Sequence, residues 1–363
     1  MHQPLNKCLI SKNNLIANYQ ALTKQIETSQ IAAVVKADGY GLGAFEIVQY
    51  LNAQNCNQFF VANFDEALNL CHAIKTRLNV FKKIKIGVFS GFSGFNIAQD
   101  FYLEAQALNH IIEIIPVVNT LTELEKLAKI KQRYPAFIHI DTGINRSGIS
   151  YGEFDKKCDY IVTLTKQINC VGILSHLACA DQPTHPLNKT QLERFLQIKK
   201  KLGSSFKYSL SASGGVFLGN AYHFNFARCG ISLYGGTPND QATKYIKPVI
   251  SLYARVLQIQ THTKNTSIGY GADYLTASKE RVATIGCGYN DGILRSVTQE
   301  SVFYFKNQPL QIIGRISMDL VTLHVPSHVN IVEGDYVEII GNHQKLQNLA
   351  QSMGTIDYEI LCR

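Results

Sequence analysis

The chain has 363 residues, of which 46% are hydrophobic and 17% charged, and this composition indicates a globular protein rather than a disordered one. Its net charge of +8 is spread along the sequence, which excludes a dedicated nucleic-acid tail and favours small anionic ligands. The cysteines include no CxxC pair, no metal site is predicted, and no apolar run reaches the ~20 residues of a membrane span. The first residues predict no export signal, so we expect a cytoplasmic protein with reduced thiols.

The first diagnostic stretch is IAAVVKADGYGLG, at residues 31–43. Five apolar residues without alternation predict a strand that is buried on both faces and ends at Lys36. The turn formers Asp38, Gly39 and Gly41 follow directly. Two interpretations of this lysine are open. Its stem could pack on the sheet while the amine reaches water, or partial burial could lower its proton affinity and make it a nucleophile or base.

Short apolar runs then alternate with amphipathic segments. The candidate strands are residues 31–35, 59–62, 84–89, 111–118, 136–140, 170–174, 207–210 and 225–231. The clearest helical patterns are residues 44–51, 64–73, 120–131 and 192–200. Eight strand–helix units in succession predict a (β/α)8 barrel of the TIM type over residues 9–235.

The sequence changes character after the turn-rich residues 235–240, GGTPND. The strand-like runs beyond them are residues 249–260, 281–285, 301–305, 310–313, 320–324 and 336–340. These runs have little helix between them and predict a mostly antiparallel β-domain over residues 236–363, closed by a helix near residues 344–352. Residues 1–8 are candidates to pair with its sheet.

Chemistry in a (β/α)8 barrel lies on the loops after the carboxyl ends of the strands. The polar or glycine residues at these ends are Lys36, Tyr40, Asp141, Thr142, Arg146, His176, Asp181, Ser213, Gly214, Gly215, Arg228 and Gly230. The last two loops of this fold often bind phosphate, for which the Ser213 hydroxyl and nearby glycine amides are suited. A lysine, a phosphate site and an arginine around one barrel mouth indicate pyridoxal 5'-phosphate. Taken singly, the glycines could form a plain turn and His176 could be a core histidine.

Two stretches of the predicted β-domain have no evident structural purpose. Residues 268–274, IGYGADY, place Tyr270 between two glycines. Residues 314–319, GRISMD, follow a predicted strand and include Met318. Either stretch could also be a turn covered by an aromatic residue.

The ordered motifs AVVKADGYG, DTGINRSG, SHLACAD, FARCGISLYG, GYGADY, GYNDG and GRISMD together resemble those of the alanine racemase family, of pyridoxal-phosphate-dependent fold type III. The resemblance extends to Tyr358, almost the whole chain. It implies a barrel and a β-domain in a head-to-tail homodimer with shared active sites. It also implies that Lys36 binds the cofactor covalently and is the base for D-alanine, while Tyr270 of the other subunit is the base for L-alanine.

The resemblance implies roles for further residues of this sequence. The residues that would contact the phosphate of the cofactor are Tyr40, Ser213, Gly230 and Ile231. Arg228 would face the pyridine nitrogen, and His176 would link it to Tyr270. The substrate carboxylate or its surroundings would meet Arg146 and the backbone of Met318. Tyr289 matches a tyrosine near the phosphate, and the residues matching the substrate corridor are Asp181, Arg295 and Arg315.

The implied activity is interconversion of L- and D-alanine, which supplies D-alanine for peptidoglycan in the cell wall. A racemase for other amino acids, such as serine or lysine, is an alternative. A weakly active pyridoxal-phosphate-binding homologue is another, and a non-catalytic barrel that only carries the cofactor is a third. Three residues depart from the family pattern: His139 where many relatives have a carbamylated lysine, Ala212 where many have asparagine, and Leu42 in place of a common histidine. With His139 there, Arg146 must be held by something else, for which Asp141 and a bound anion are candidates.

Overall fold

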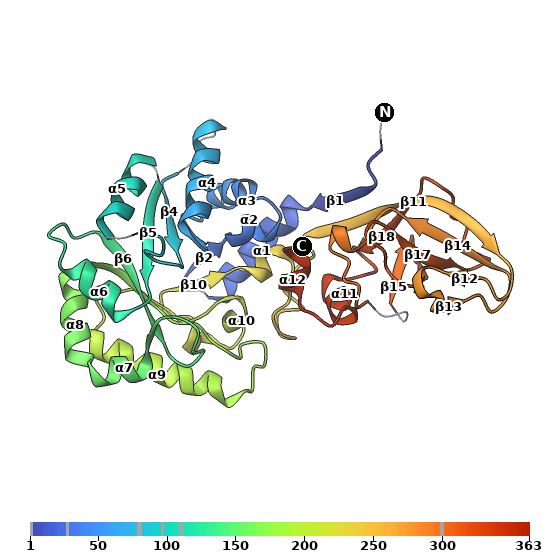
Figure 1. Cartoon of the computed structure of the whole chain (residues 1–363). Coiled ribbons are helices and arrows are strands. Elements are labelled where there is room, and N and C mark those ends of the chain that lie inside the picture. The colour runs from blue at the N-terminus through green and yellow to red at the C-terminus, as the bar shows by residue number, and fades with distance from the viewer. Residues whose placement is uncertain (1–2, 27–28, 78–81, 96–97, 109–111, 298–300) are drawn as a thin grey trace. The chain divides into compact units, whose positions relative to one another are not determined.

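The structure is a computed structural model that describes residues 3–26, 29–77, 82–95, 98–108, 112–297 and 301–363. The chain forms two compact units, coloured from blue to red along the sequence in Figure 1. The barrel unit comprises residues 15–233 and 237–246, and the β-unit comprises residues 1–14, 234–236 and 247–363.

The barrel unit contains parallel strands in the order β10-β2-β3-β4-β5-β6-β8-β9 (Figure 1). These strands are β2 (Gln30–Val34), β3 (Gln58–Val61), β4 (Ile84–Val88), β5 (Ile112–Val118), β6 (Pro135–Asp141), β8 (Asn169–Leu174), β9 (Tyr208–Ser209) and β10 (Phe226–Cys229). The ring nearly closes where Ala212 bridges Arg228 and the Arg228 amide donates to the Ser211 carbonyl at 2.9 Å. The predicted TIM-type barrel is confirmed, with every predicted strand present, although Ile111 lies outside the described residues.

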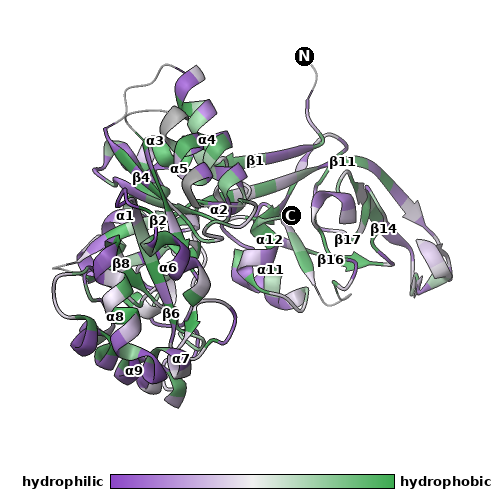
Figure 2. Ribbon diagram, turned by 60° about the vertical axis from the view of Figure 1, so that its left-hand side comes forward, coloured by the Kyte–Doolittle hydropathy of each residue, from purple (hydrophilic) through white to green (hydrophobic). Residues whose placement is uncertain are grey.

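Helices pack outside the strands, and Figure 2 shows apolar strands with more polar outer helices such as α9. They are α1 (Lys12–Gln25), α3 (Ala44–Ala53), α4 (Phe64–Thr76), α5 (Ala98–Leu108), α6 (Leu121–Ala128), α7 (Tyr151–Lys156), α8 (Cys158–Gln167) and α9 (Pro186–Leu202). The start of α6 shows why these segments fold locally, because Thr120 and Glu123 form a reciprocal capping box. Inside the barrel, the rings of Phe60, Phe137 and Phe226 from three strands pack within 5.3 to 6.4 Å of one another.

The β-unit is built on a closed antiparallel sheet. Its strands run in the order β11 (Ile250–His262), β14 (Glu280–Ile285), β17 (Val321–Val325), β16 (Gln308–Ile313), β15 (Val302–Phe305) and β18 (Tyr336–Ile340), and β18 pairs back with β11. The N-terminal strand β1 (Asn6–Ile10) adds to β11, while residues 1–2 lie outside the described residues. The expected antiparallel β-domain is confirmed. A small hairpin of β12 (Ser267–Ile268) and β13 (Tyr274–Leu275) was not predicted.

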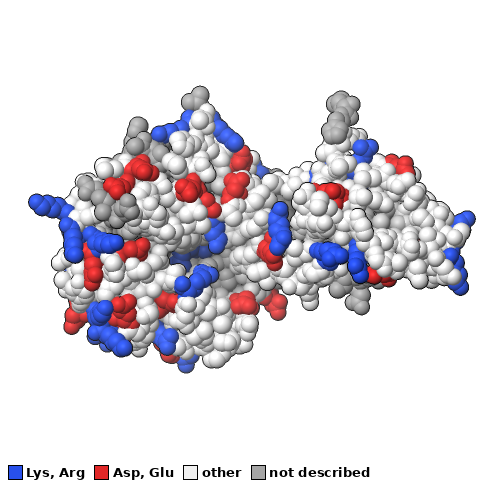
Figure 3. Space-filling view, viewed as in Figure 1, with Lys and Arg blue, Asp and Glu red and all other residues white. Residues whose placement is uncertain are grey.

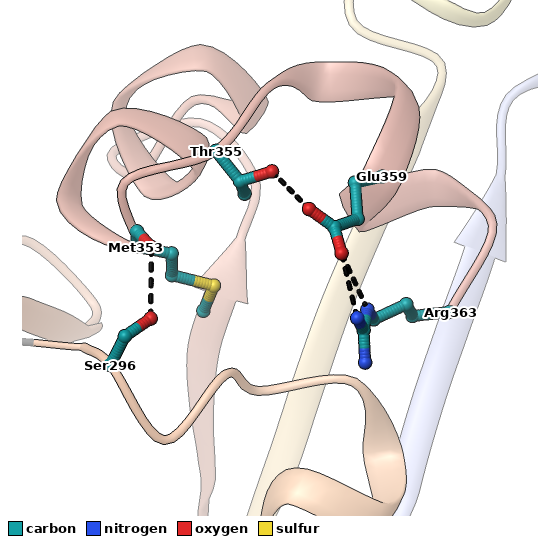
Figure 4. Close-up of polar contacts among 5 residues, drawn as sticks. All are labelled: Ser296, Met353, Thr355, Glu359 and Arg363. Atoms are coloured by element: carbon teal, nitrogen blue, oxygen red, sulfur yellow. Dashed lines mark hydrogen bonds and ion pairs between the residues drawn. The ribbon is translucent and has the colours of Figure 1, made fainter.

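The β-unit ends in α11 (Leu346–Ser352) and α12 (Asp357–Leu361). Figure 4 shows how short-range polar contacts fix this segment. The Ser296 hydroxyl donates to the Met353 carbonyl at 2.9 Å, and Glu359 pairs with Arg363 at 2.6 Å and with the Thr355 hydroxyl. The C-terminal turns are therefore held within the β-unit itself.

On the face drawn in Figure 3, basic and acidic side chains are interspersed over the barrel unit. The described part of that face thus carries no continuous basic tract of the kind that nucleic acids require. Among the described helices, none combines the length and apolar character needed to cross a membrane.

Candidate active site

The chain leaves β2 through a left-handed turn that begins at Lys36. Ala37, Asp38, Gly39 and Tyr40 all have φ between +48° and +66°. A left-handed conformation costs an L-residue about 1–2 kcal/mol, so such a run persists only where surrounding contacts enforce it. Lys36 itself is exposed. The interpretation of Lys36 as a nucleophile or base requires partial burial, and the chain by itself does not provide that burial.

Two carboxylates stabilise this turn. Glu66 in α4 accepts the backbone amides of Ala37 at 2.9 Å and Ala62 at 2.8 Å. Asp38 accepts the amide of Ala44 at 2.8 Å and so joins the turn to the start of α3. Sequence reasoning missed the role of Glu66. Glu66 lies three residues after the helix cap Asn63, a position typical of a helix start, and nothing local in the sequence indicates a bond to residue 37.

Residues from three strand ends meet beside this turn, and we call Tyr40, Ser213, Gly230 and Ile231 the strand-end cup. The Ser213 hydroxyl oxygen accepts the backbone amides of Gly230 at 3.1 Å and Ser232 at 3.3 Å. A Cβ at Gly230 would lie 2.2 Å from the Tyr40 hydroxyl, so only glycine permits this approach. Ile231 begins the short helix η2 (Ile231–Tyr234) and is buried. The structure thus brings the predicted phosphate ligands together.

Arg228 lies on β10, beside β2, and is only 4% exposed. Its guanidinium donates to the Ser209 carbonyl at 2.9 Å, to the Ser209 hydroxyl and to the Ser175 carbonyl. Burial lowers its pKa to about 10, so the group stays charged at neutral pH. No carboxylate among the described residues forms an ion pair with it. A buried cation without an anion is costly and is suited to an electron-rich ligand atom.

Two histidines near this arginine are neutral. Burial lowers the pKa of His176 to about 3, and the charge of Arg228 adds to the effect. Burial likewise lowers the pKa of His139 to about 4, with Arg228 again the second cause. The Arg146 charge also acts on both rings. The barrel mouth therefore concentrates positive charge on arginine and lysine, while its imidazoles are free to accept or donate as neutral groups.

Arg146 lies on the loop after β6, and its side chain is exposed. The Asp141 carboxylate accepts three backbone amides of this loop, those of Gly143, Ile144 and Arg146, at 2.7, 2.9 and 3.3 Å. Asp141 thus fixes the loop backbone, and no bond from its carboxylate to the Arg146 guanidinium is found among the described residues. The predicted brace by Asp141 acts on the loop rather than on the guanidinium.

In the β-unit, Tyr270 occupies the turn between β12 and β13 and is 69% exposed. Gly269 and Gly271, at φ 78° and 77°, allow the chain to double back on either side of it. Asp273 in the same turn forms an ion pair with Arg315, with Nη2 to Oδ1 at 3.1 Å. The Tyr270 turn is therefore held against the GRISMD turn.

The two remaining motifs of the β-unit also meet. The amide of Tyr289 donates to the Ser317 carbonyl at 3.1 Å, and the amide of Asn290 donates to the Met318 carbonyl at 2.9 Å. Gly288 lies so close to the Met318 carbonyl that a Cβ there would be 2.3 Å from it. The side chains of Tyr289 and Met318 remain exposed. Of the predicted corridor residues, Asp181 is exposed in the barrel unit and Arg295 in the β-unit.

These features define a class of protein. A barrel with an accessible lysine at one strand end, beside the strand-end cup and a buried guanidinium, is typical of an enzyme that works through a phosphorylated cofactor. The residues present fit such a group, since the cup contains the hydroxyls of Tyr40 and Ser213, while Arg228 has no carboxylate partner among the described residues. In the β-unit, the side chains of Tyr270 and Tyr289 are exposed.

Comparison with known proteins identifies the family. Residues 10–238 match the alanine racemase N-terminal domain, and residues 249–363 match the alanine racemase C-terminal domain. Alanine racemase of Brucella suis is 36% identical over 363 residues, covering 95% of this chain and 87% of that protein. A catabolic alanine racemase of Agrobacterium fabrum is also 36% identical, covering 95% and 86%.

A solved structure agrees. The alanine racemase of Bartonella henselae, with covalently bound pyridoxal phosphate, has a TM-score of 0.88 and 32% identity, covering 99% of this chain and 97% of that one. The chain belongs to the alanine racemase family, and the predicted resemblance is confirmed. The predicted enzyme class, a racemase among the isomerases, and the pyridoxal phosphate dependence are those of this family.

Proposed function

We propose that this protein binds pyridoxal 5'-phosphate and interconverts L- and D-alanine by a two-base mechanism. The observation that carries the proposal is the buried guanidinium of Arg228, which has no carboxylate partner in the described part of the chain. Arg228 lies beside the strand-end cup, on β10, which pairs with the strand β2 that precedes Lys36. The family membership supports the same activity.

The residues that would hold the cofactor are those already gathered at the barrel mouth. Lys36 would bind it covalently, and Tyr40, Ser213, Gly230 and Ile231 would bind its phosphate. Arg228 would face the ring nitrogen. Because a guanidinium does not give up its proton, that nitrogen would stay unprotonated. When bound, the cofactor withdraws electrons from the substrate and so makes its α-proton acidic.

Racemisation requires a proton to leave one face of the α-carbon and another to arrive on the opposite face. Lys36 would exchange the proton on the face of D-alanine, and Tyr270 of the second subunit would exchange it on the face of L-alanine. An unperturbed tyrosine, with a pKa near ~10, is a weak base at neutral pH. Arg228, through His176, would place positive charge beside the Tyr270 hydroxyl. Each positioned base contributes ~10² to 10⁴ in rate.

Arg146 and the backbone of Met318 would contact the substrate carboxylate or its surroundings. Tyr289 would lie near the phosphate, and the residues of the substrate corridor would be Asp181, Arg295 and Arg315. The exposed Tyr270 turn supports a head-to-tail homodimer, because an exposed base requires a second surface to form a closed site. The proposed domains are a barrel of residues 9–235 and a β-domain of residues 236–363, with which residues 1–8 pair.

The proposed location is the cytoplasm, and the proposed role is supply of D-alanine for peptidoglycan. Support for the location comes from the cysteines, none of which forms a disulfide in the described part of the chain. A racemase of different amino-acid specificity remains the second candidate. The neutral His139, where many relatives carry an anion, is the observation that favours it, because the charge around Arg146 differs.

The decisive experiment measures exchange of the α-proton in heavy water, with purified protein and each L- and D-amino acid in turn. We expect deuterium in both L- and D-alanine, dependence on added cofactor, and much slower exchange with serine and lysine. Faster exchange with another amino acid would replace the substrate in this proposal. No exchange with any amino acid, in protein that has bound the cofactor, would leave only the non-catalytic alternative.

A further inference from the structure

Asn119, directly after β5, has a side-chain amide of fixed orientation. Its Nδ2 donates to the carbonyl oxygens of Phe89 at 2.8 Å and Val117 at 2.9 Å. Its Oδ1 lies 3.0 Å from Nδ1 of His139. Exchanging the amide oxygen and nitrogen would place an acceptor against two carbonyl oxygens, so the oxygen must be the atom that faces the histidine.

This amide oxygen determines the tautomer of His139. An amide oxygen can only accept, so Nδ1 of the ring carries the hydrogen and donates it. In the neutral imidazole, Nε2 then has a lone pair and no hydrogen. This Nε2 atom is buried and has no hydrogen-bond partner among the described residues. A buried acceptor without a donor is costly, and in a native site it indicates a donor that arrives with a ligand.

The loop that carries Arg146 lies against the same ring. Gly148, at φ +102°, is so close that a Cβ there would be 2.9 Å from both Cγ and Nδ1 of His139. The start of the loop is fixed by the Asp141 carboxylate, which accepts the Arg146 amide at 3.3 Å. The segment bearing Arg146 is thus anchored on one side by Asp141 and on the other by contact with His139.

We propose that Nε2 of His139 accepts a hydrogen bond from the Arg146 guanidinium when the substrate carboxylate binds, and that Asn119 fixes the tautomer which makes this bond possible. The inference rests on the proposed function, which assigns the substrate carboxylate to Arg146. A guanidinium has five N–H donors, so it can satisfy one lone pair while two others hold a carboxylate. His139 and Asn119 are therefore positioning residues.

A neutral acceptor performs this task without adding a negative charge. A carboxylate beside Arg146 would pair with the guanidinium and compete with the substrate for its charge. The His139 imidazole orients the guanidinium without neutralising it, so the full charge is available to the incoming carboxylate. The effect should therefore fall on substrate binding rather than on proton transfer.

The test replaces His139 by Phe, which keeps a flat ring against Gly148 and removes both nitrogens. We expect KM for alanine and the inhibition constant of propionate, an inert carboxylate, to rise roughly 10- to 100-fold, as for loss of a charge-assisted hydrogen bond. The kcat and the cofactor absorption spectrum should stay nearly constant. Because the two residues act as one unit, His139→Phe combined with Arg146→Ala should be no worse than Arg146→Ala alone.

Three further variants and one spectroscopic measurement complete the test. His139→Gln, whose amide oxygen can accept, should recover part of the binding of propionate. Asn119→Leu should allow both ring tautomers, whereas nitrogen NMR of the unaltered chain should show a protonated Nδ1 and a bare Nε2 in His139. His72→Phe, on the exposed side of α4, is the matched control and should change neither constant.

Unchanged binding of propionate in His139→Phe, additive losses in the double variant, or a protonated Nε2 would each overturn the inference. Absence of alanine turnover in the unaltered chain would count against the proposed function instead. In that case the tautomer and the calorimetric affinity for propionate still decide the role of His139.

Discussion

The barrel mouth and the turns of the β-unit both carry candidate site residues, but they hold them in opposite ways. In the barrel unit, Tyr40, Ser213 and Arg228 are at most 5% exposed and are fixed by contacts across strands. In the β-unit, Tyr270 is 69% exposed and Met318 is 54% exposed. The barrel residues are therefore preorganised by their own unit, whereas the β-unit offers side chains to a surface that it does not itself supply. Cofactor binding and catalysis should accordingly be separable by mutation.

Lys36→Ala should have the largest effect, because it removes both the covalent attachment and one base. We expect loss of the borohydride-reducible cofactor linkage and a fall in racemisation of at least ~10⁴-fold. Absorption spectra before and after borohydride treatment provide the measurement. Lys85→Ala, on β4 two strands away from β2, is the control and should keep both properties. A reducible linkage that survives in Lys36→Ala would assign the attachment to another lysine.

Tyr270→Phe tests the exposed turns of the β-unit. The variant should bind the cofactor normally, since the turn is remote in sequence from the cup, but lose ~10² to 10⁴ of the racemisation rate. The control is Tyr160→Phe, which removes another exposed tyrosine hydroxyl, on α8. It should change neither cofactor binding nor the racemisation rate.

Mixing Lys36→Ala with Tyr270→Phe then examines the shared site. A head-to-tail dimer would regain one working site in each mixed pair. Activity that stays at the level of the parents after subunit exchange would argue for a site built within one chain.

The sequence predicts the barrel well because its strands are uninterrupted apolar runs, which periodicity detects directly. It does not predict the left-handed turn, in which Ala37 and Tyr40 take a positive φ although neither is glycine. That turn depends on Glu66, whose partner lies 29 positions away in the sequence. The β12–β13 hairpin is missed for another reason. Its strands are two residues long, too short for any period to appear.

The candidate site was predictable as a set of strand ends but not as an electrostatic arrangement. The motif around Arg228 gives no sign that the guanidinium is buried without a carboxylate. Likewise, the lone pair on Nε2 of His139 follows from Asn119, which no motif singled out. Both properties depend on which side chains meet across the barrel, and that information is not local in the sequence.

Acidification should destabilise the barrel unit through its neutral histidines. The pKa values of His139 and His176 lie at about 4 and 3, below the ~6.5 of an unfolded histidine. The unfolded chain therefore binds protons that the folded one excludes, and stability falls as the pH drops from 6.5 towards 4. Each histidine can contribute up to ~1.4 kcal/mol per pH unit. Urea unfolding at several pH values should show a shallower loss in His139→Phe than in His72→Phe. If stability falls equally steeply with pH in both variants, folding does not lower the pKa of His139.

Glu66→Gln addresses the turn after Lys36. The substitution weakens the acceptor for the Ala37 and Ala62 amides, so the free energy of unfolding should fall by about 1–2 kcal/mol. Cofactor affinity should fall with it, because the same turn orients Lys36 and Tyr40. Asp65→Asn changes the neighbouring exposed carboxylate in the same helical turn and is the control. Lower stability with unchanged cofactor affinity would show that the turn does not position Lys36.

The smallest effect is expected at the ion pair beside Tyr270. Asp273 and Arg315 are both partly exposed, and such pairs contribute about 0–1 kcal/mol. Asp273→Asn should therefore lower kcat by at most ~5-fold, by loosening the Tyr270 turn, lower the free energy of unfolding by at most about 1 kcal/mol and leave KM unchanged. The control is Glu359→Gln, which breaks the similarly exposed Glu359–Arg363 pair of Figure 4 and should leave kcat as it is. A 100-fold loss in Asp273→Asn would instead place Asp273 or Arg315 in contact with the substrate. In that event the exposed turns of the β-unit would be as finely organised as the barrel mouth.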